Sequence, residues 1–288
     1  MRLDLHTHST HSDGTLSPRQ LVVHASALGL SAIALTDHDS TDGLDEAAGA
    51  AQEVGITFVP GVELSVGPID GRDIHMLAYF VDPGDAVLQR RLRELRAARF
   101  ERARRMVEAL DEAGYTVGID DVVDIAAHGA VGRSHVAKAL VARGHAATIA
   151  DAFQRFIGHG QPFYHPKPAT DPAEVVGLLV ARGAIPVVAH PGVSGADDLL
   201  EGLVSAGLRG IEAYHADHTQ EQMRYFAKRA VALGLLVTGG SDYHGPDGRN
   251  PELGSVALPD GVLKSLLDAG RASATTRDTD RHDGTVTG

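Results

Sequence analysis

The sequence contains no cysteine, so disulfides and cysteine-ligated zinc sites are excluded, and any metal ion must be held by His, Asp or Glu. It also lacks any apolar run approaching eighteen residues, so no membrane-spanning helix is predicted. The first residues, MRLDLHTH, have neither the apolar core nor the cleavage site of a signal peptide, and we therefore expect a cytoplasmic protein. Tryptophan is absent and aromatic residues make up only 5 % of the chain, which leaves few side chains to stack on a base.

Positive charge is scarce except in one segment. The chain of 288 residues has a net charge of −12, which argues against a general nucleic-acid coat and against a stable duplex as partner. Residues 90–167 nevertheless hold thirteen Lys and Arg against nine Asp and Glu, a local charge of +4. An acidic body with a basic segment suits bound cations together with an anionic substrate. The alternative is that the eight arginines between Arg90 and Arg105 only solvate one face of a helix.

Seven short apolar runs are typical of buried strands, and helical patterns separate most of them. They cover residues 2–6, 31–38, 56–63, 73–80, 184–190, 210–216 and 234–244. Ser17–Pro18 and Asp171–Pro172 each predict the start of a helix, because they combine a capping side chain with a proline in the first turn. This alternation predicts an α/β fold with a parallel sheet closed into a β/α barrel, and an open doubly wound sheet is the alternative.

One segment interrupts the alternation of strands and helices. Between residues 85 and 167 the pattern is helical, with a long amphipathic helix ending near Gly114 and further helices at about 119–127, 133–143 and 147–157. We therefore expect a discontinuous barrel formed by residues 1–84 and 168–270, with residues 85–167 inserted as an all-helical cap. Residues 271–288 are polar, and we expect this tail to be partly disordered.

Side chains that bind metals fall near the predicted carboxyl ends of six strands. They are His6 and His8, then Asp37 and His38, Glu63, His190, Glu212 and His215, and Asp242 and His244, while His75 lies within the fourth strand. The carboxyl ends of parallel barrel strands gather on one face, so these side chains predict a shared metal centre. Their number exceeds the needs of one cation, and imidazole with carboxylate suits Zn, Mn or Fe.

The ordered motifs HTHSTHSDG, LTDHD, PGVE, IHMLAYF, AHPG and GGSDYH resemble those of the polymerase-and-histidinol-phosphatase (PHP) family over about residues 3–250. The insertion sequences VGRSHVAKALVARGH and AFQRFIGHGQPFY resemble a subgroup that includes the nucleoside 3′,5′-bisphosphate phosphatases. The resemblance implies a distorted (β/α)7 barrel holding two or three divalent metal ions.

The family pattern also implies which residues hold each ion. It places His6, His8, Glu63 and Asp242 on one ion, Glu63, His75 and His190 on a second, and Asp13, His38 and His244 on a third. His11 occupies a variable place in the motif, and we expect it to be a loop residue. Asp37 and His215 have no ligand role in the pattern, and we expect them to assist catalysis, Asp37 by orienting an imidazole or a metal-bound water.

The predicted reaction is attack of a metal-bridging hydroxide on a phosphomonoester, since the sequence offers no nucleophile motif and no phosphate loop. The resemblance and the basic charge of the insertion indicate substrate contacts in the cap, namely Arg99, Arg102, Arg133, Ser134, His135 and Lys167. A nucleoside 3′,5′-bisphosphate losing its 3′-phosphate fits two anionic sites. Candidates for stacking on the base are Phe156, Phe163, Tyr164 and Tyr214.

Other functions remain open from the sequence. A 5′-to-3′ exoribonuclease acting on short RNA ends would use the same metals and cap. Histidinol phosphatase is a further alternative, although an arginine-rich cap suits its cationic substrate poorly. An amidohydrolase-type deaminase also begins with His-x-His, and a non-catalytic metal-binding module is the alternative from a different class.

Overall fold

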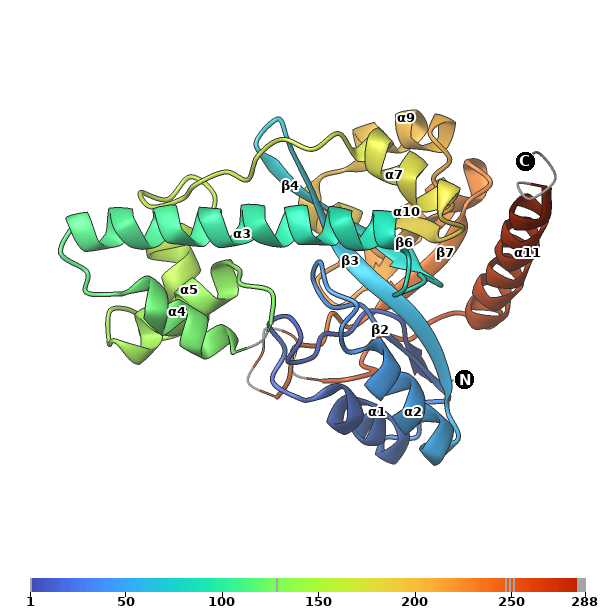
Figure 1. Cartoon of the computed structure of the whole chain (residues 1–288), viewed down its shortest axis with the longest axis horizontal. Coiled ribbons are helices and arrows are strands. Elements are labelled where there is room, and N and C mark those ends of the chain that lie inside the picture. Colours follow the sequence, from blue (N-terminus) through green and yellow to red (C-terminus); the bar gives the residue numbers. More distant parts are fainter. Residues whose placement is uncertain (1, 128, 247, 249, 251, 284–288) are drawn as a thin grey trace.

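The structure is a computed structural model that describes residues 2–283 except 128, 247, 249 and 251, with the backbone alone for residues 276–283. Its centre is a seven-stranded sheet in the order β1 to β7 (Figure 1). The strands are β1 (Leu3–Asp4), β2 (Ala32–Leu35), β3 (Thr57–Ile69), β4 (Arg72–Tyr79), β5 (Ile185–Val188), β6 (Gly210–His215) and β7 (Leu236–Gly240). Each predicted run overlaps one of these strands, although β3 continues six residues past its run and β4 begins one residue before its own. The α/β barrel prediction is confirmed.

The expectation of a wholly parallel sheet is wrong at one strand. β4 runs antiparallel to both neighbours, β3 and β5, while the other adjacent pairs in the sheet are parallel. The physical reason is the short Asp70–Gly71 turn between β3 and β4, which closes a hairpin where a parallel connection would need a crossover of a dozen or more residues. Because β4 is reversed, its beginning lies at the end of the barrel where the parallel strands finish.

The sheet curls until its first and last strands meet. The Leu5 backbone N–H donates to the Gly239 carbonyl at 3.2 Å, and the His8 N–H donates to the Tyr243 carbonyl at 2.9 Å. Gly240 permits this approach, since a Cβ there would lie 2.4 Å from the His6 nitrogen. The sheet therefore forms a nearly closed barrel.

Alternating residues of β2 face different apolar clusters. Ala32 and Ala34 belong to the cluster that also contains Val262 and Leu266 of α11 (Val262–Asp283), whereas Ile33 of the same strand packs in the larger cluster with the surrounding helices. Those helices are α1 (Pro18–Ala27), α2 (Leu44–Val54), α7 (Pro172–Ala181), α9 (Leu200–Ser205) and α10 (Gln220–Ala232), together with Leu88, Leu92 and Leu95 of the segment after β4. The short α8 (Pro191–Ser194) follows β5. Ser17 and Asp171 cap α1 and α7 as predicted.

The segment between β4 and α7 is largely helical and carries its own core. Its helices are α3 (Ala86–Glu112), α4 (Ile119–Ala126), α5 (Arg133–Ala142) and α6 (Ile149–Ala152), the last continuing into a π-helical turn at Phe153–Ile157. Met106, Leu110, Val136, Leu140 and Phe156 belong to an apolar cluster distinct from the barrel clusters. This separate core supports the proposed division of the chain into a barrel and an inserted cap.

The end of the chain is helical as far as the structure describes it, and the expectation of a partly disordered tail stays a prediction. Helix α11 continues to Asp283, so residues 271–283 are helical, and residues 284–288 lie outside the described residues. In Figure 1, α11 and helices α4 and α5 lie on opposite sides of the barrel. No helix in the described part of the chain is long and apolar enough to cross a membrane.

Candidate metal centre and phosphate pocket

Imidazoles and carboxylates from all seven strands meet at one end of the barrel. Ligand atoms lie within 4.8 Å of one another in four groups, namely His6–His8–Glu63–Asp242, His8–Asp13–His38–His244, His38–Glu63–His75 and His6–Glu212–His215. Parallel strands deliver their carboxyl ends to this face, and the reversed β4 delivers His75 from near its beginning. His11 belongs to none of these groups.

Glu63 lies at the middle of the cluster, and its two oxygens face different histidines. Oε1 lies 2.7 Å from His75 Nδ1 and 3.1 Å from His190 Nε2. Oε2 lies 3.0 Å from His38 Nδ1 and 3.3 Å from Nε2 of both His6 and His8. Burial raises the pKa of Glu63, but the surrounding imidazoles outweigh burial and hold it well below its usual value. A carboxylate shared in this way can bridge two cations.

Glu212 orients His6. The fully buried Glu212 carboxylate accepts a hydrogen bond from His6 Nδ1 at 3.0 Å and another from the His190 backbone N–H at 2.8 Å. Because Nδ1 of His6 faces a carboxylate, that nitrogen carries the proton, and the Nε2 lone pair is directed into the cluster. This carboxylate–histidine arrangement is the usual way of orienting a metal-binding imidazole.

His215 has a different hydrogen-bonding pattern. Its Nδ1 accepts from the Asp217 backbone N–H at 3.1 Å, so the neutral ring carries its proton on Nε2. Nε2 faces Oδ2 of Asp242 at 3.6 Å. A protonated nitrogen cannot ligate a metal, and this geometry suits a group that orients Asp242.

Asp13 joins the barrel end to the insertion. Its Oδ1 lies 3.1 Å from His244 Nε2 and 4.0 Å from His38 Nε2. Its Oδ2 accepts from the Ser134 hydroxyl at 2.7 Å, and its backbone carbonyl accepts from Lys138 Nζ at 2.9 Å. Helix α5 therefore begins directly over this group of ligands.

Asp37 acts on the loop after β1. Its carboxylate accepts from the Ser9 backbone N–H at 2.7 Å, and from the hydroxyls of Ser9 and Ser12 at 2.6 Å each. Ser12 Oγ in turn lies 3.3 Å from His8 Nδ1. Asp37 thus reaches an imidazole only through Ser12, and its direct contacts hold the loop in place.

The donor atoms of the cluster fit metal ions because the cluster leaves them unsatisfied. Six of these donor atoms are buried and have no hydrogen-bond partner among the described residues, namely Nε2 of His6 and His8, Nδ1 of His38 and His190, Oδ1 of Asp13 and Oε2 of Glu63. Burial lowers the pKa of His8, but Asp242 and Glu63 outweigh burial and raise it to about 10. The cluster therefore requires positive charge, which divalent ions supply when bound.

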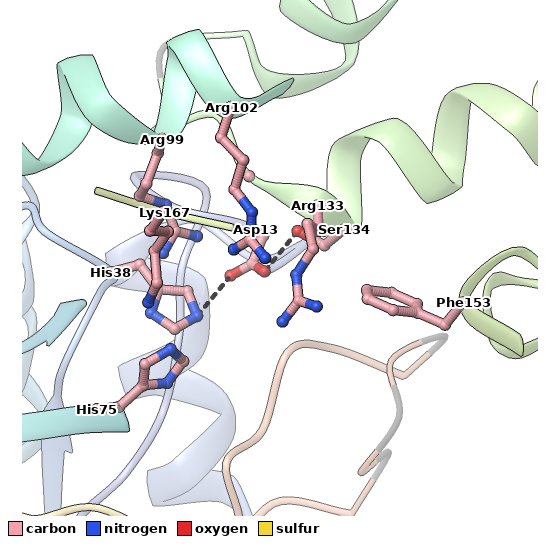
Figure 2. Close-up of a pocket in the computed structure, with 10 residues that line it drawn as sticks. Asp13, His38, His75, Arg99, Arg102, Arg133, Ser134, Phe153 and Lys167 are labelled. Atoms are coloured by element: carbon pink, nitrogen blue, oxygen red, sulfur yellow. Dashed lines mark hydrogen bonds and ion pairs between the residues drawn. The ribbon is translucent and has the colours of Figure 1, made fainter. Parts of the chain in front are cut away.

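A basic pocket of about 110 Å³ adjoins the cluster (Figure 2). His38, His75 and Asp13 line one side, and the insertion contributes Arg99, Arg102, Arg133, Ser134, Phe153 and Lys167. Arg99 donates to Ser65 Oγ at 2.7 Å and lies 3.5 Å from Asp39 Oδ2. Burial lowers the pKa of Lys167 to about 8, so the ammonium is still largely charged at neutral pH.

His135 is the predicted substrate contact that lies away from the pocket lining. Its ring is buried, and Nδ1 accepts from the Gly132 backbone N–H at 3.0 Å at the start of α5. The imidazole therefore stabilises the beginning of a helix, and its contact with a substrate stays a prediction.

The expected stacking residues also lie elsewhere. Phe156 is in the core of the insertion, Phe163 packs against that core, and Tyr214 packs in the barrel core. Tyr164 lies against Arg102, with the guanidinium 5.1 Å from the ring centroid. Phe153, which was not among the expected stacking residues, lines the pocket.

Comparisons with known proteins identify the family. The model described as PHP domain matches residues 4–163. This chain belongs to the PHP family. A 3′,5′-nucleoside bisphosphate phosphatase from Chromobacterium violaceum is 36 % identical over 85 % of this chain and 87 % of its own.

Other PHP relatives carry different activity names. A phosphoribosyl 1,2-cyclic phosphate 1,2-diphosphodiesterase from Eggerthella lenta is 33 % identical over 87 % of this chain and 97 % of its own. A 5′-3′ exoribonuclease from Haemophilus influenzae is 34 % identical over 86 % of this chain and 91 % of its own. A solved structure from Bifidobacterium adolescentis, assigned as a metal-dependent phosphoesterase, is 35 % identical, has a TM-score of 0.86 and covers 93 % of this chain and 96 % of its own. This PHP protein is thus a metal-dependent phosphoesterase.

The PHP centre includes residues whose roles the sequence does not reveal. Glu212 ends a predicted strand, which is a signal for the site, but its hydrogen bond to His6 depends on the closed barrel. Lys138 and Phe153 lie within ordinary helical patterns and gave no signal. Asp73 pairs with three cations of the insertion. In the sequence, only its position two residues before His75 indicates that it lies near the metal centre.

Proposed function

We propose that this PHP protein hydrolyses the 3′-phosphate of nucleoside 3′,5′-bisphosphates and leaves the 5′-monophosphate. The observation that carries the proposal is the basic pocket directly beside the metal-binding groups, with His38 and His75 lining it. A substrate with two phosphates can place one on the metals and the other among the cations of the insertion. The Chromobacterium violaceum relative, named for this activity, supports the same choice.

The metal assignment is part of this proposal. We assign His6, His8, Glu63 and Asp242 to one ion, Glu63, His75 and His190 to a second, and Asp13, His38 and His244 to a third. In support, the first and third sets lie within two of the observed groups, and His75 and His190 contact the same Glu63 oxygen. Divalent Mn, Fe or Zn ions held there would polarise phosphoryl oxygens and lower the pKa of a water molecule.

The protein's own groups then have defined tasks. Glu212 keeps the proton of His6 on Nδ1, and His215 directs its Nε2 proton toward Asp242. In the proposed reaction water adds to phosphorus, the P–O3′ bond breaks, and O3′ leaves with a proton. Cations of the insertion hold the part of the substrate that becomes the nucleoside 5′-monophosphate.

The charge of the pocket matches a phosphate group. Arg99, Arg102, Arg133 and Lys167 supply four positive charges, and Asp39 and Asp73 pair with them. Asp13 also lines the pocket, so four cations face three carboxylates and the charged side chains keep a net positive charge. A phosphate group supplies the negative charge that such a pocket attracts.

A second candidate is a 5′-to-3′ exoribonuclease, and a second pocket favours it. This pocket, of about 410 Å³, shares His38, His75 and Arg133 with the basic pocket and extends past His190 and Asp217. Both reactions break the P–O3′ bond of the nucleotide whose 5′-phosphate occupies the basic pocket. They differ in whether further nucleotides follow the scissile phosphorus, and the second pocket offers space on that side.

The test compares substrates on the purified, Mn²⁺-loaded chain. We would measure kcat/KM for adenosine 3′,5′-bisphosphate, adenosine 3′-monophosphate, a 5′-phosphorylated dinucleotide and histidinol phosphate. The proposal predicts the highest value for the bisphosphate. A higher value for the dinucleotide supports the exoribonuclease, and a bisphosphate value below that of the monophosphate contradicts both. Asp242→Asn is the control that should abolish metal-dependent turnover of every substrate.

A further inference from the structure

Asp73 connects the barrel to three separate parts of the insertion. It lies on β4, and its Oδ2 is 2.9 Å from Arg133 Nη2 and 3.3 Å from Arg102 Nη2, while Oδ1 is 3.5 Å from Lys167 Nζ. Arg102 comes from α3, Arg133 begins α5, and Lys167 lies in the segment that returns to the barrel. One carboxylate thus gathers cations from three segments of the chain.

The three cations depend on this carboxylate. Within the described residues, Asp73 is the only carboxylate within 4.0 Å of the charged nitrogens of Arg102, Arg133 or Lys167. The side chains of Arg102 and Lys167 are 7 % and 6 % exposed, so water screens their mutual repulsion poorly. Without a nearby negative charge, these groups would separate or turn toward solvent.

Other contacts hold the cations only partly. Arg102 Nε donates to the His165 carbonyl at 2.6 Å, which fixes one edge of its guanidinium. Arg133 lies against the Phe153 ring, with its guanidinium carbon 5.5 Å from the centroid. These contacts bring the two arginines near the pocket, and Asp73 is the carboxylate that both arginines and Lys167 share.

We propose that Asp73 is a positioning residue for the substrate's second phosphate. Its carboxylate assembles Arg102, Arg133 and Lys167 before substrate binds, so the phosphate meets a formed site. This inference rests on the proposed function, in which these cations hold the 5′-phosphate. It excludes the opposite role, in which Asp73 competes with the phosphate and its removal strengthens binding.

The test is Asp73→Asn in the full-length, Mn²⁺-loaded protein, since the amide keeps the shape and removes the charge. We expect KM for adenosine 3′,5′-bisphosphate to rise about 10- to 100-fold, because contacts between phosphate and charged side chains are weakened. KM and kcat for adenosine 3′-monophosphate, which lacks the second phosphate, should stay within about twofold of the unmodified protein.

An equal rise of both KM values would show that Asp73 only supports the structure, and an unchanged or lower bisphosphate KM would overturn the inference directly. Asp121→Asn is the matched control, because Asp121 pairs with Arg143 at 2.5 Å elsewhere in the insertion, and it should alter neither KM. If Asp73→Asn does not fold, Asp73→Glu, which displaces the charge, replaces it. The inference then predicts that Asp73→Glu raises KM for the bisphosphate and leaves KM for the 3′-monophosphate unchanged.

A parallel variant separates this inference from the proposed function. Arg133→Ala removes a proposed phosphate contact itself. If it leaves the bisphosphate KM unchanged, the basic pocket does not hold the second phosphate, and the proposed function fails. If it raises that KM and Asp73→Asn does not, the pocket is correct and only the role of Asp73 is refuted.

Discussion

Replacing Glu212 by Gln should weaken metal binding without changing any proposed ligand. Glu212 is fully buried, and it accepts one hydrogen bond from His6 Nδ1 and one from the His190 backbone. An amide offers a single oxygen, so one of these buried donors would face an NH₂ group. An unsatisfied buried donor costs about 1–3 kcal/mol, which agrees with the about 10- to 100-fold losses of metal affinity seen when such supporting partners are removed.

Isothermal titration of the metal-free protein with Mn²⁺ would measure this effect. We expect the dissociation constant to rise about 10- to 100-fold, or about 1.4–2.7 kcal/mol. The control is Glu201→Gln, the same chemical change at a side chain that is 73 % exposed, which should leave the affinity unchanged. Unchanged Mn²⁺ affinity in a folded Glu212→Gln protein would refute the argument that Glu212 orients His6.

Three further predictions concern the metals and the pocket. Asp13→Ala should reduce the bound metal measured by elemental analysis, because it removes a carboxylate oxygen 3.1 Å from His244; unchanged stoichiometry would remove Asp13 from the ligands. Arg133→Ala should raise KM for the bisphosphate about 10- to 100-fold with little change in kcat, and an equal loss with the 3′-monophosphate would contradict its role. Burial lowers the pKa of Lys167 to about 8, so its positive charge is lost as pH rises through 8, and KM for the bisphosphate should rise above that pH. Lys167→Arg keeps the charge and should flatten the pH profile; an identical rise would assign the effect to another group.

The strands and most proposed metal ligands were predictable because local signals are strong there. Apolar runs mark each strand, and His, Asp and Glu fall where the runs finish. The reversal of β4 was not predictable from such runs, since a buried strand has the same composition in either direction. His75 shows the consequence, because it lies near the beginning of β4 and still reaches Glu63 at 2.7 Å.

The supporting residues were harder to predict because their roles depend on contacts between distant segments. Glu212 meets His6 across 206 residues of chain, and only the closed barrel brings them together. Asp73 meets Arg102, Arg133 and Lys167 only once the insertion folds back over the barrel. His135 shows a related case, since its place in GRSH predicts a substrate contact but not the hydrogen bond that its ring accepts at the start of α5.

A crystal structure of the Mn²⁺-loaded protein with adenosine 5′-monophosphate, the proposed product, tests the central claim most directly. The account predicts that the 5′-phosphate lies within hydrogen-bonding distance of Arg102, Arg133 and Lys167, and that O3′ points toward the ions bound around Glu63. A 5′-phosphate bound on the metal ions, with the basic pocket free of the nucleotide, would contradict it.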